Sequence, residues 1–320
     1  MKKFWKLGLS AFLAIGLLTA CGEGAKNEKP ASSEQQETTQ VDKATFPMTI
    51  TDAVGKEITL ESPPEKIVSL IPSNTEILFA LGLNNEIVGV TDNDDYPAEA
   101  TEKQKVGGME YNIEQIIALQ PDIVFAHASS MTFSAGAIEQ LESAGLKVFV
   151  VTNAKDFNEI YTTIEQLGRA TGKLPEAKKI IKDMKTKVEE VLAKIKDVKP
   201  KKVFVEASDE PHIFTAGKDT FMNEMLNMIH AENVAADTAD WYEISSEQII
   251  AKNPDVIVVT YHYVPDILTK LPQRAGFDTI NAVKNKAIVQ VDENTTSRQG
   301  PRLGEGLEEL AKAIYPEAFK

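Results

Sequence analysis

The 320-residue sequence is short of the side chains that build most covalent and metal-centred sites. It has one cysteine and four histidines. A single cysteine excludes a disulfide framework and a multi-cysteine zinc site. The few, dispersed histidines disfavour a metal-ion-binding protein. Basic residues are also scarce, 34 against 48 acidic ones, and the resulting net charge of −14 disfavours binding to nucleic acid phosphates.

The motifs of common nucleotide-binding and hydrolytic enzymes are absent as well. The sequence contains no G-x-x-x-x-G-K-[ST], no H-E-x-x-H and no G-x-S-x-G. A hydrolase with a scattered Ser, His and Asp stays open, because spacing does not reveal such a triad. We therefore expect a protein that is not an enzyme and that carries no cofactor.

The N-terminal sequence is typical of a targeting segment. A cationic start, MKKFWK, precedes an apolar stretch over Leu7–Leu18 that is too short to span a membrane. The sequence LTAC that follows resembles the lipobox of bacterial lipoproteins, which implies a signal peptide over 1–20 and a lipid on Cys21. An ordinary secretory signal is the alternative. We expect the mature protein on the extracytoplasmic face of the cell membrane, held through its lipid anchor only.

Residues 21–45 predict a flexible tether that starts at the lipidated cysteine. Val41 is the only bulky aliphatic residue in this stretch. Such a segment cannot bury enough apolar surface to offset its chain entropy. It suits a domain that must reach away from its anchor.

From residue 46 onward, apolar runs of strand length alternate with helical segments. MTITDAVGKEITL predicts a β-hairpin. Two series of strands follow: KIVSLI, EIVGVT, DIVFA and KVFVVT, then KKVFVEA, DVIVVTY and AIVQVD. Helices are expected near 74–82, 112–119 and 135–144 in the first series, and near 219–229, 245–252 and 303–314 in the second. This alternation predicts an α/β fold with parallel sheets. We place an N-terminal lobe at 46–174 and a C-terminal lobe at 201–320.

A long helix is predicted between the lobes, over residues 175–200. Ile181, Met184, Val188 and Ile195 recur at three- and four-residue steps among charged residues. Pro200 stops the helix. A helix of this length could bridge two lobes or be an ordinary surface helix, and the sequence does not distinguish the two.

An internal repeat relates the two lobes. Residues 112–126, NIEQIIALQPDIVFA, and 245–259, SSEQIIAKNPDVIVV, share seven of fifteen positions. With Asn112 and Ser245 as N-caps, Glu114 and Glu247 occupy the second helical position of each copy. The two glutamates either favour the positive helix end or form a matched pair of docking contacts.

The segments KIVSLIPSNTEILFALGL, VGVTDNDDYP, KVGGMEYNIEQIIALQPDIVFA, IFTAGKDTFMNEML and SRQGPRL resemble the substrate-binding proteins of ABC importers for cobalamin, ferric siderophores and haem. The resemblance covers residues 46–320 and is closest to the cobalamin-binding branch. It implies two α/β lobes joined by one long helix, with a ligand cleft between them. It also implies a monomer that delivers its ligand to a permease, with Glu114 and Glu247 docking onto permease arginines.

The ligand contacts are the least determined part of the resemblance. Phe214 and Trp241 align with aromatic ligand contacts of the cobalamin-binding family, and Arg298 with a polar one. The first lobe departs from that family at its aromatic positions, where this chain has Asn93, Gly108 and His127. We expect these three residues to contact the ligand from the first lobe.

Haem and ferric siderophores are the two alternative ligands. Met109 and His262 fall where a haem-binding relative has its axial ligands. Ferric siderophores are often anionic and call for clustered arginines. The chain has only four arginines, which mildly favours a neutral, amide-rich ligand such as cobalamin.

Overall fold

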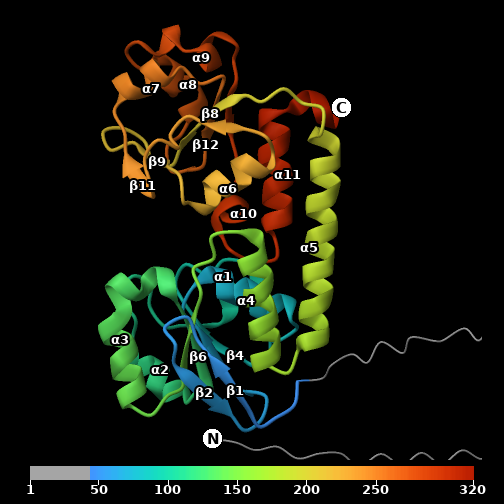
Figure 1. Ribbon diagram of the computed structural model, residues 1–320. Coiled ribbons are helices and arrows are strands. Elements are labelled where there is room, and N and C mark those ends of the chain that lie inside the picture. Colours follow the sequence, from blue (N-terminus) through green and yellow to red (C-terminus); the bar gives the residue numbers. More distant parts are fainter. Residues whose placement is uncertain (1–43) are drawn as a thin grey trace, which may run out of the picture. The chain divides into compact units, whose positions relative to one another are not determined.

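The computed structural model describes residues 44–320 (Figure 1). The predicted signal peptide, Cys21 and nearly all of the predicted tether lie outside the described residues. Those described fall within one compact unit. Among residues 44–320, no helix is both long and apolar enough to cross a lipid bilayer.

The N-terminal lobe is built on a parallel sheet whose strands run in the order β5-β4-β3-β6-β7. The bounds of these strands are β3 Ile67–Ser69, β4 Ile87–Val90, β5 Gln104–Lys105, β6 Ile123–His127 and β7 Val148–Val151. The predicted hairpin is confirmed as β1 (Met48–Thr51) paired with β2 (Glu57–Leu60). The helices of this lobe are α1 Pro72–Ala80, α2 Ile113–Leu119, α3 Met131–Ser143 and α4 Phe157–Ala170.

The C-terminal lobe has a second parallel sheet, in the order β10-β8-β12-β13, and a small antiparallel pair, β9–β11. Its strands are β8 Lys202–Glu206, β9 Phe214–Ala216, β10 Glu232–Asn233, β11 Trp241–Glu243, β12 Val256–Val259 and β13 Ile288–Gln290. Its helices are α6 Phe221–Met228, α7 Ser246–Lys252, α8 Ile267–Lys270, α9 Asn281–Lys284, α10 Glu293–Ser297 and α11 Leu303–Ile314. Short 3-10 turns occupy Ala98–Glu102, Ala128–Ser130, Leu271–Gln273, Phe277–Thr279 and Pro316–Phe319. The two parallel α/β lobes predicted from the sequence are confirmed.

The long helix α5 (Leu174–Ile195) bridges the lobes, as predicted. It packs against α4 of the N-terminal lobe and α11 of the C-terminal lobe (Figure 1). Its 22 residues span about 33 Å. The helix ends at Ile195 and not near residue 200. Ile195 is the last buried apolar residue of the helix. Further on, Pro200 disfavours helical backbone at Lys199.

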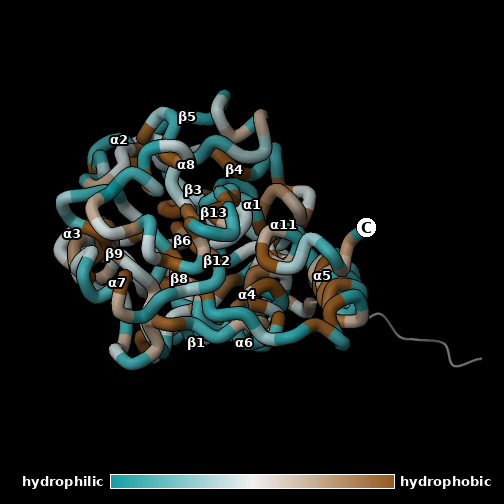
Figure 2. Tube along the Cα trace, turned by 90° about the horizontal axis from the view of Figure 1, so that it is seen from above, coloured by the Kyte–Doolittle hydropathy of each residue, from teal (hydrophilic) through white to brown (hydrophobic). Residues whose placement is uncertain are grey.

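One hydrophobic core runs through both lobes along this helix. It joins Ile67 and Phe125 of the first sheet to Val203 and Met225 of the C-terminal lobe through side chains such as Val191 on α5. Each lobe has one further apolar cluster on the other side of its sheet. Along the Cα trace, hydrophobic stretches lie mostly inside and hydrophilic ones at the periphery (Figure 2).

Candidate functional site

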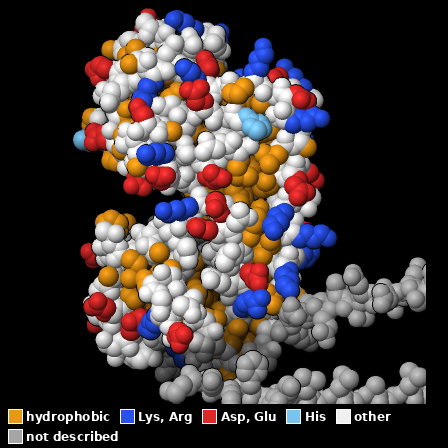
Figure 3. All heavy atoms as spheres, in the orientation of Figure 1, with side chains coloured by type: hydrophobic (Ala, Val, Ile, Leu, Met, Phe, Trp, Pro, Cys, Tyr) orange, Lys and Arg blue, Asp and Glu red, His pale blue; other side chains and the backbone are white. Residues whose placement is uncertain are grey.

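The lobes meet where the strands of the N-terminal sheet end. Ala154, just beyond β7, donates its backbone N–H to Gln299 Oε1 at 2.8 Å. Glu76, on the helix that follows β3, pairs with Arg298 of the C-terminal lobe. The surface is notched between the lobes (Figure 3). Since ligands of open parallel sheets bind beyond the carboxyl ends of the strands, this junction is the candidate site.

A cavity of about 290 Å³ opens at the junction and takes its walls from both lobes. Its lining residues are Asn153, Ala154, Lys155, Asp219, Thr220, Phe221, Met222, Asp240, Trp241, Thr296, Ser297 and Gln299. A cavity of about 560 Å³ lies elsewhere, beside residues such as Glu65 and Lys147 that precede strands. The smaller cavity is the better candidate because it lies at the carboxyl ends and between the lobes.

The antiparallel pair β9–β11 presents two aromatic side chains on one face. Trp241 pairs with Ala216 and Glu243 with Phe214, so Trp241 and Phe214 are diagonal neighbours on that face. Phe214 is 40% exposed and Trp241 48% exposed. The sequence predicted both as ligand contacts, and the sheet brings them together beside the interlobe cavity.

The three predicted contacts of the N-terminal lobe are placed differently from one another. Asn93 is exposed in the loop after β4. Gly108 lies beside Asn93, since a Cβ added to Gly108 would be 3.8 Å from Asn93 Nδ2. His127, the last residue of β6, is buried. Its Nδ1 lies 2.8 Å from Ser129 Oγ. Burial lowers the pKa of His127 to about 4, against a hydrogen bond with the Thr152 backbone that raises it, so the ring is neutral near pH 7.

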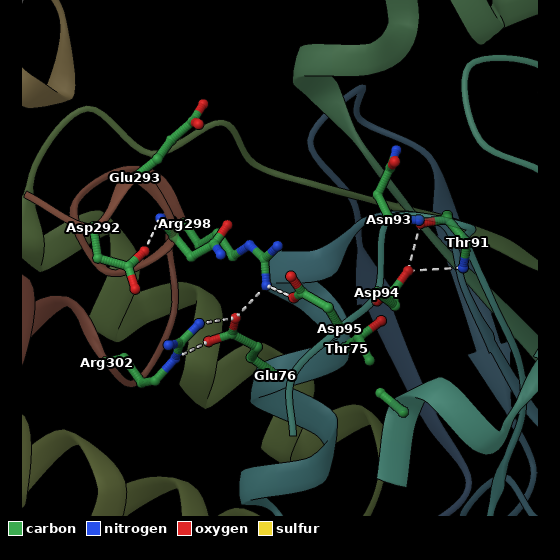
Figure 4. Close-up of polar contacts among 12 residues, drawn as sticks. Thr75, Glu76, Thr91, Asn93, Asp94, Asp95, Asp292, Glu293, Arg298 and Arg302 are labelled. Carbon is green, nitrogen blue, oxygen red and sulfur yellow. Dashed lines mark hydrogen bonds and ion pairs between the residues drawn. The ribbon is translucent and has the colours of Figure 1, made fainter. Parts of the chain in front are cut away.

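Arg298 is held in a network of charges in which Glu76 is buried and Asp95 is exposed (Figure 4). Its Nη1 lies 3.0 Å from Glu76 Oε1 and 2.6 Å from Asp95 Oδ1. Arg302 binds Glu76 through two bonds, Nε–Oε2 at 2.8 Å and Nη2–Oε1 at 2.6 Å. Burial opposes the charge of Arg298, but hydrogen bonds to Asp95 and Glu76 raise its pKa. The predicted ligand contact of Arg298 would therefore use Nη2 and Nε, which these ion pairs do not occupy.

A second arginine network lies within the C-terminal lobe. Arg274 binds both oxygens of Glu206, at 2.7 and 2.9 Å, and Asp209 Oδ1 at 2.6 Å. The Tyr261 hydroxyl donates to Glu206 Oε1 at 2.6 Å. With Arg169 bound to Glu165, every arginine of the chain pairs with a carboxylate of its own chain.

The helix caps expected for the internal repeat are present. Asn112 accepts from the Gln115 N–H at 3.0 Å, and Ser245 forms a full capping box with Gln248. Glu114 and Glu247 each occupy the second helical position and are exposed. The carboxylate of Glu247 has local hydrogen-bond donors, its own backbone N–H and the Ser245 hydroxyl. These hydrogen bonds lower the pKa of Glu247. The docking role of both glutamates stays a prediction.

The two residues that match haem ligands are exposed on different lobes. Met109 precedes α2 and His262 follows β12. Within residues 44–320, no group of three or more His, Cys, Asp or Glu is arranged to hold a metal ion.

Sequence reasoning missed several side chains at the same sheet edges. Phe133, in the first turn of α3, is 75% exposed, and Tyr263, just beyond β12, is 66% exposed. The available signal for both was an aromatic residue within a few positions of the end of a buried strand, β6 for Phe133 and β12 for Tyr263. Glu76 was also missed, although a carboxylate next to the apolar run ILFA of a helix signals a buried partner.

Two parallel-sheet lobes, one bridging helix and a polar and aromatic junction between them define a two-lobed ligand-binding protein. Residues 67–295 match the periplasmic binding protein family, and the chain belongs to that family. Its members bind a substrate and do not transform it, which confirms the prediction that the chain is not an enzyme.

The relatives agree with this assignment. The chain is 46% identical, over the full length of both proteins, to the uncharacterized ABC transporter substrate-binding lipoprotein YvrC of Bacillus subtilis. It is 33% identical to the vitamin B12-binding protein of Vibrio parahaemolyticus, over 64% of this chain and 74% of the relative. A crystal structure from Staphylococcus epidermidis, described as a possible iron-binding periplasmic solute-binding protein, has 39% identity and a TM-score of 0.73. The likeness covers 79% of this chain and all of that one. The family resemblance and the fold expected from it are both confirmed.

Proposed function

We propose that this protein is the substrate-binding lipoprotein of an ABC importer and that it captures cobalamin outside the cytoplasm. The observation that carries the proposal is the exposed pair Phe214 and Trp241 beside a cavity with walls from both lobes. Flat aromatic walls suit a large macrocycle, because apolar ring faces bury area and stack. The name of the Vibrio relative, a vitamin B12-binding protein, supports the same ligand.

The pairing of the arginines favours a neutral ligand over an anionic one. A ferric siderophore is the competing ligand, and the description of the Staphylococcus structure as possibly iron-binding points toward it. An anionic siderophore would need free guanidinium groups as bidentate partners. Arg274 and Arg302 instead bind the buried carboxylates of Glu206 and Glu76 through two bonds each. Arg298 keeps only Nη2 and Nε outside its ion pairs. An amide-rich neutral ligand makes no such demand.

Haem is the third candidate for the cleft. It would need Met109 and His262 to approach one iron from opposite lobes. Both side chains are exposed and free to turn toward a ligand. The aromatic pair Phe214 and Trp241, which carries the cobalamin proposal, does not depend on Met109 or His262. Cobalamin therefore remains the proposed ligand.

Delivery to the permease is proposed to use Glu114 and Glu247. The two side chains are exposed at equivalent positions of the internal repeat, one on each lobe. A symmetric pair of permease subunits offers equivalent partners to such a pair. In this proposal the lipid on Cys21 keeps the protein beside the permease.

The delivery step is tested by uptake of labelled cobalamin into vesicles that contain the permease. We expect the double variant Glu114→Ala, Glu247→Ala to bind cobalamin normally but to stimulate little uptake, since losing charge pairs at an interface costs about 2–5 kcal/mol. The matched control is Glu139→Ala with Glu232→Ala, which also removes one exposed glutamate per lobe. Normal uptake by the first double variant would leave Glu114 and Glu247 as residues that only favour their helix ends.

A further inference from the structure

A single buried carboxylate joins the two lobes. The side chain of Glu76, on α1, is 2% exposed, and its two oxygens receive three bonds from Arg298 and Arg302. These arginines are 222 and 226 residues further along the chain and belong to the loop between α10 and α11. Asp95 adds a fourth charge, so that two carboxylates balance two guanidinium groups.

The same loop is attached to the N-terminal lobe at a second point. Gln299 accepts from the Ala154 N–H and donates to Ala154 O at 2.8 Å and to Asn153 Oδ1 at 3.0 Å. Gly300 lies against α1, and a side chain added there would approach Glu76 Cβ to 3.8 Å. Residues 298–302 thus contact the chain beyond β7 and the helix beyond β3 together.

From this juxtaposition we propose that Glu76 is a positioning residue that clamps the lobes together and sets the width of the ligand cleft. The lobes are already joined by α5, and the clamp is a second connection at the N-terminal end of α11. An opening of the cleft at this point must break the three bonds that the buried carboxylate of Glu76 accepts from Arg298 and Arg302. The clamp also fixes the guanidinium of Arg298 with Nη1 turned away from any ligand.

The clamp is tested first without any ligand, by the distance between the lobes. Spin labels at Glu139→Cys on α3 and Asp278→Cys in the C-terminal lobe, both exposed positions, report this distance. Cys21→Ser in the mature chain leaves these two thiols as the only ones. Double electron–electron resonance should give one narrow distribution for the parent. Glu76→Gln should broaden it and shift it to longer distances.

Glu206→Gln is the matched control. It removes a carboxylate that is also buried and that also accepts three bonds, two from Arg274 and one from Tyr261. These bonds lie within one lobe, so the distribution of this variant should equal that of the parent. A parent-like distribution for Glu76→Gln would overturn the proposal. Should Glu76→Gln fail to fold, Arg302→Lys is the second test, because it keeps the positive charge but loses the two-bond contact of Arg302 with Glu76. It should broaden the distribution less strongly, and an unchanged distribution there would equally overturn the clamp.

The effect on binding rests on the proposed function and is measured separately. Glu76→Gln should weaken cobalamin binding about tenfold, which corresponds to about 1.4 kcal/mol, while Glu206→Gln should not change it. Unchanged affinity in a variant with a broadened distance would refute the positioning role but retain the clamp. If the parent itself binds no cobalamin, the proposed ligand fails, and the distance measurement still decides the clamp.

Discussion

Individual side chains at the junction have environments that determine their chemistry. Trp241 and Phe214 lie exposed on one sheet face, whereas His127, at the end of a buried strand, is enclosed and neutral. From the sequence all three are expected to contact the ligand, Trp241 and Phe214 as aromatic contacts of the cobalamin-binding family and His127 at a position where that family has an aromatic residue. The structure separates them, because burial and hydrogen bonding depend on neighbours that are distant in sequence.

The aromatic pair makes the first residue-scale prediction. Trp241→Ala should weaken cobalamin binding about 3- to 10-fold, because stacking on an aromatic wall adds about 0.5–1.5 kcal/mol beyond area burial. Phe214→Ala should act in the same direction. Titration calorimetry measures both. Val54→Ala, an exposed apolar truncation in the hairpin turn, is the control and should bind like the parent. Parent-like affinity in Trp241→Ala would mean that the indole only anchors its loop.

His127 makes a prediction about pH. The pKa of its imidazole is about 4 in the folded protein, because burial disfavours the charged form, and about 6.5 in the unfolded chain. Below pH 6.5 the unfolded state therefore binds more protons, and the contribution of His127 to stability falls as the pH drops from 6.5 to 4. The difference between the folded and the unfolded pKa of His127 corresponds to about 3 kcal/mol.

The comparison that isolates this contribution is between the parent and His127→Gln. Denaturant unfolding at pH 7 and at pH 4 should give a difference in stability between the two proteins that shrinks or reverses at the lower pH. A difference that is the same at both pH values would show that the imidazole is not kept neutral by burial.

At the scale of elements, regular segments were predictable and short ones were not. Residues 303–314 were expected as a helix and form α11, because its apolar residues repeat on one face. Helix α3 was expected from residue 135 and begins at Met131, since Gly136 and the polar Thr132 and Ser134 weaken the pattern. The β9–β11 pair was not expected, because strands of three residues are too short to show alternation.

The contact between α5 and α11 makes the element-scale prediction. Glu308 on α11 accepts from Lys187 at 2.6 Å, and lies 3.5 Å from Lys194 and 3.2 Å from Lys312. The hydrogen bond from Lys187 is the main cause that lowers the pKa of Glu308 to about 2. Since the folded pKa lies below the unfolded one, this stabilisation is present above about pH 4.5 and is lost as the pH falls toward 2.

Glu308→Gln should therefore lower the free energy of unfolding by about 1–2 kcal/mol at pH 7, an amount reduced for solvent screening. The loss should become smaller at pH 3, which denaturant unfolding at the two pH values can measure. Glu165→Gln breaks the exposed Arg169 pair within α4 and serves as the control, with an expected loss below about 0.5 kcal/mol. Equal losses in the two variants would contradict a special role for Glu308.

At the scale of the whole molecule, the two lobes and the bridging helix were predictable because an internal repeat and a long amphipathic pattern are visible in the sequence. The contacts that hold the lobes together were not predictable from the sequence. Glu76 and its arginines are more than 220 residues apart, and no spacing rule connects them. Ligand identity is equally hidden, because it depends on which side chains stay free once the internal pairs are made.

The proposed function requires that the cleft between the lobes binds one cobalamin. Native mass spectrometry of the mature chain, carrying Cys21→Ser and mixed with equal amounts of cobalamin, haem and several ferric siderophores, tests it most directly. We expect a single adduct with the mass of one cobalamin per chain, and a weaker adduct in Trp241→Ala. An adduct with haem that is lost in Met109→Ala and His262→Ala, or an adduct with a ferric siderophore alone, would contradict it.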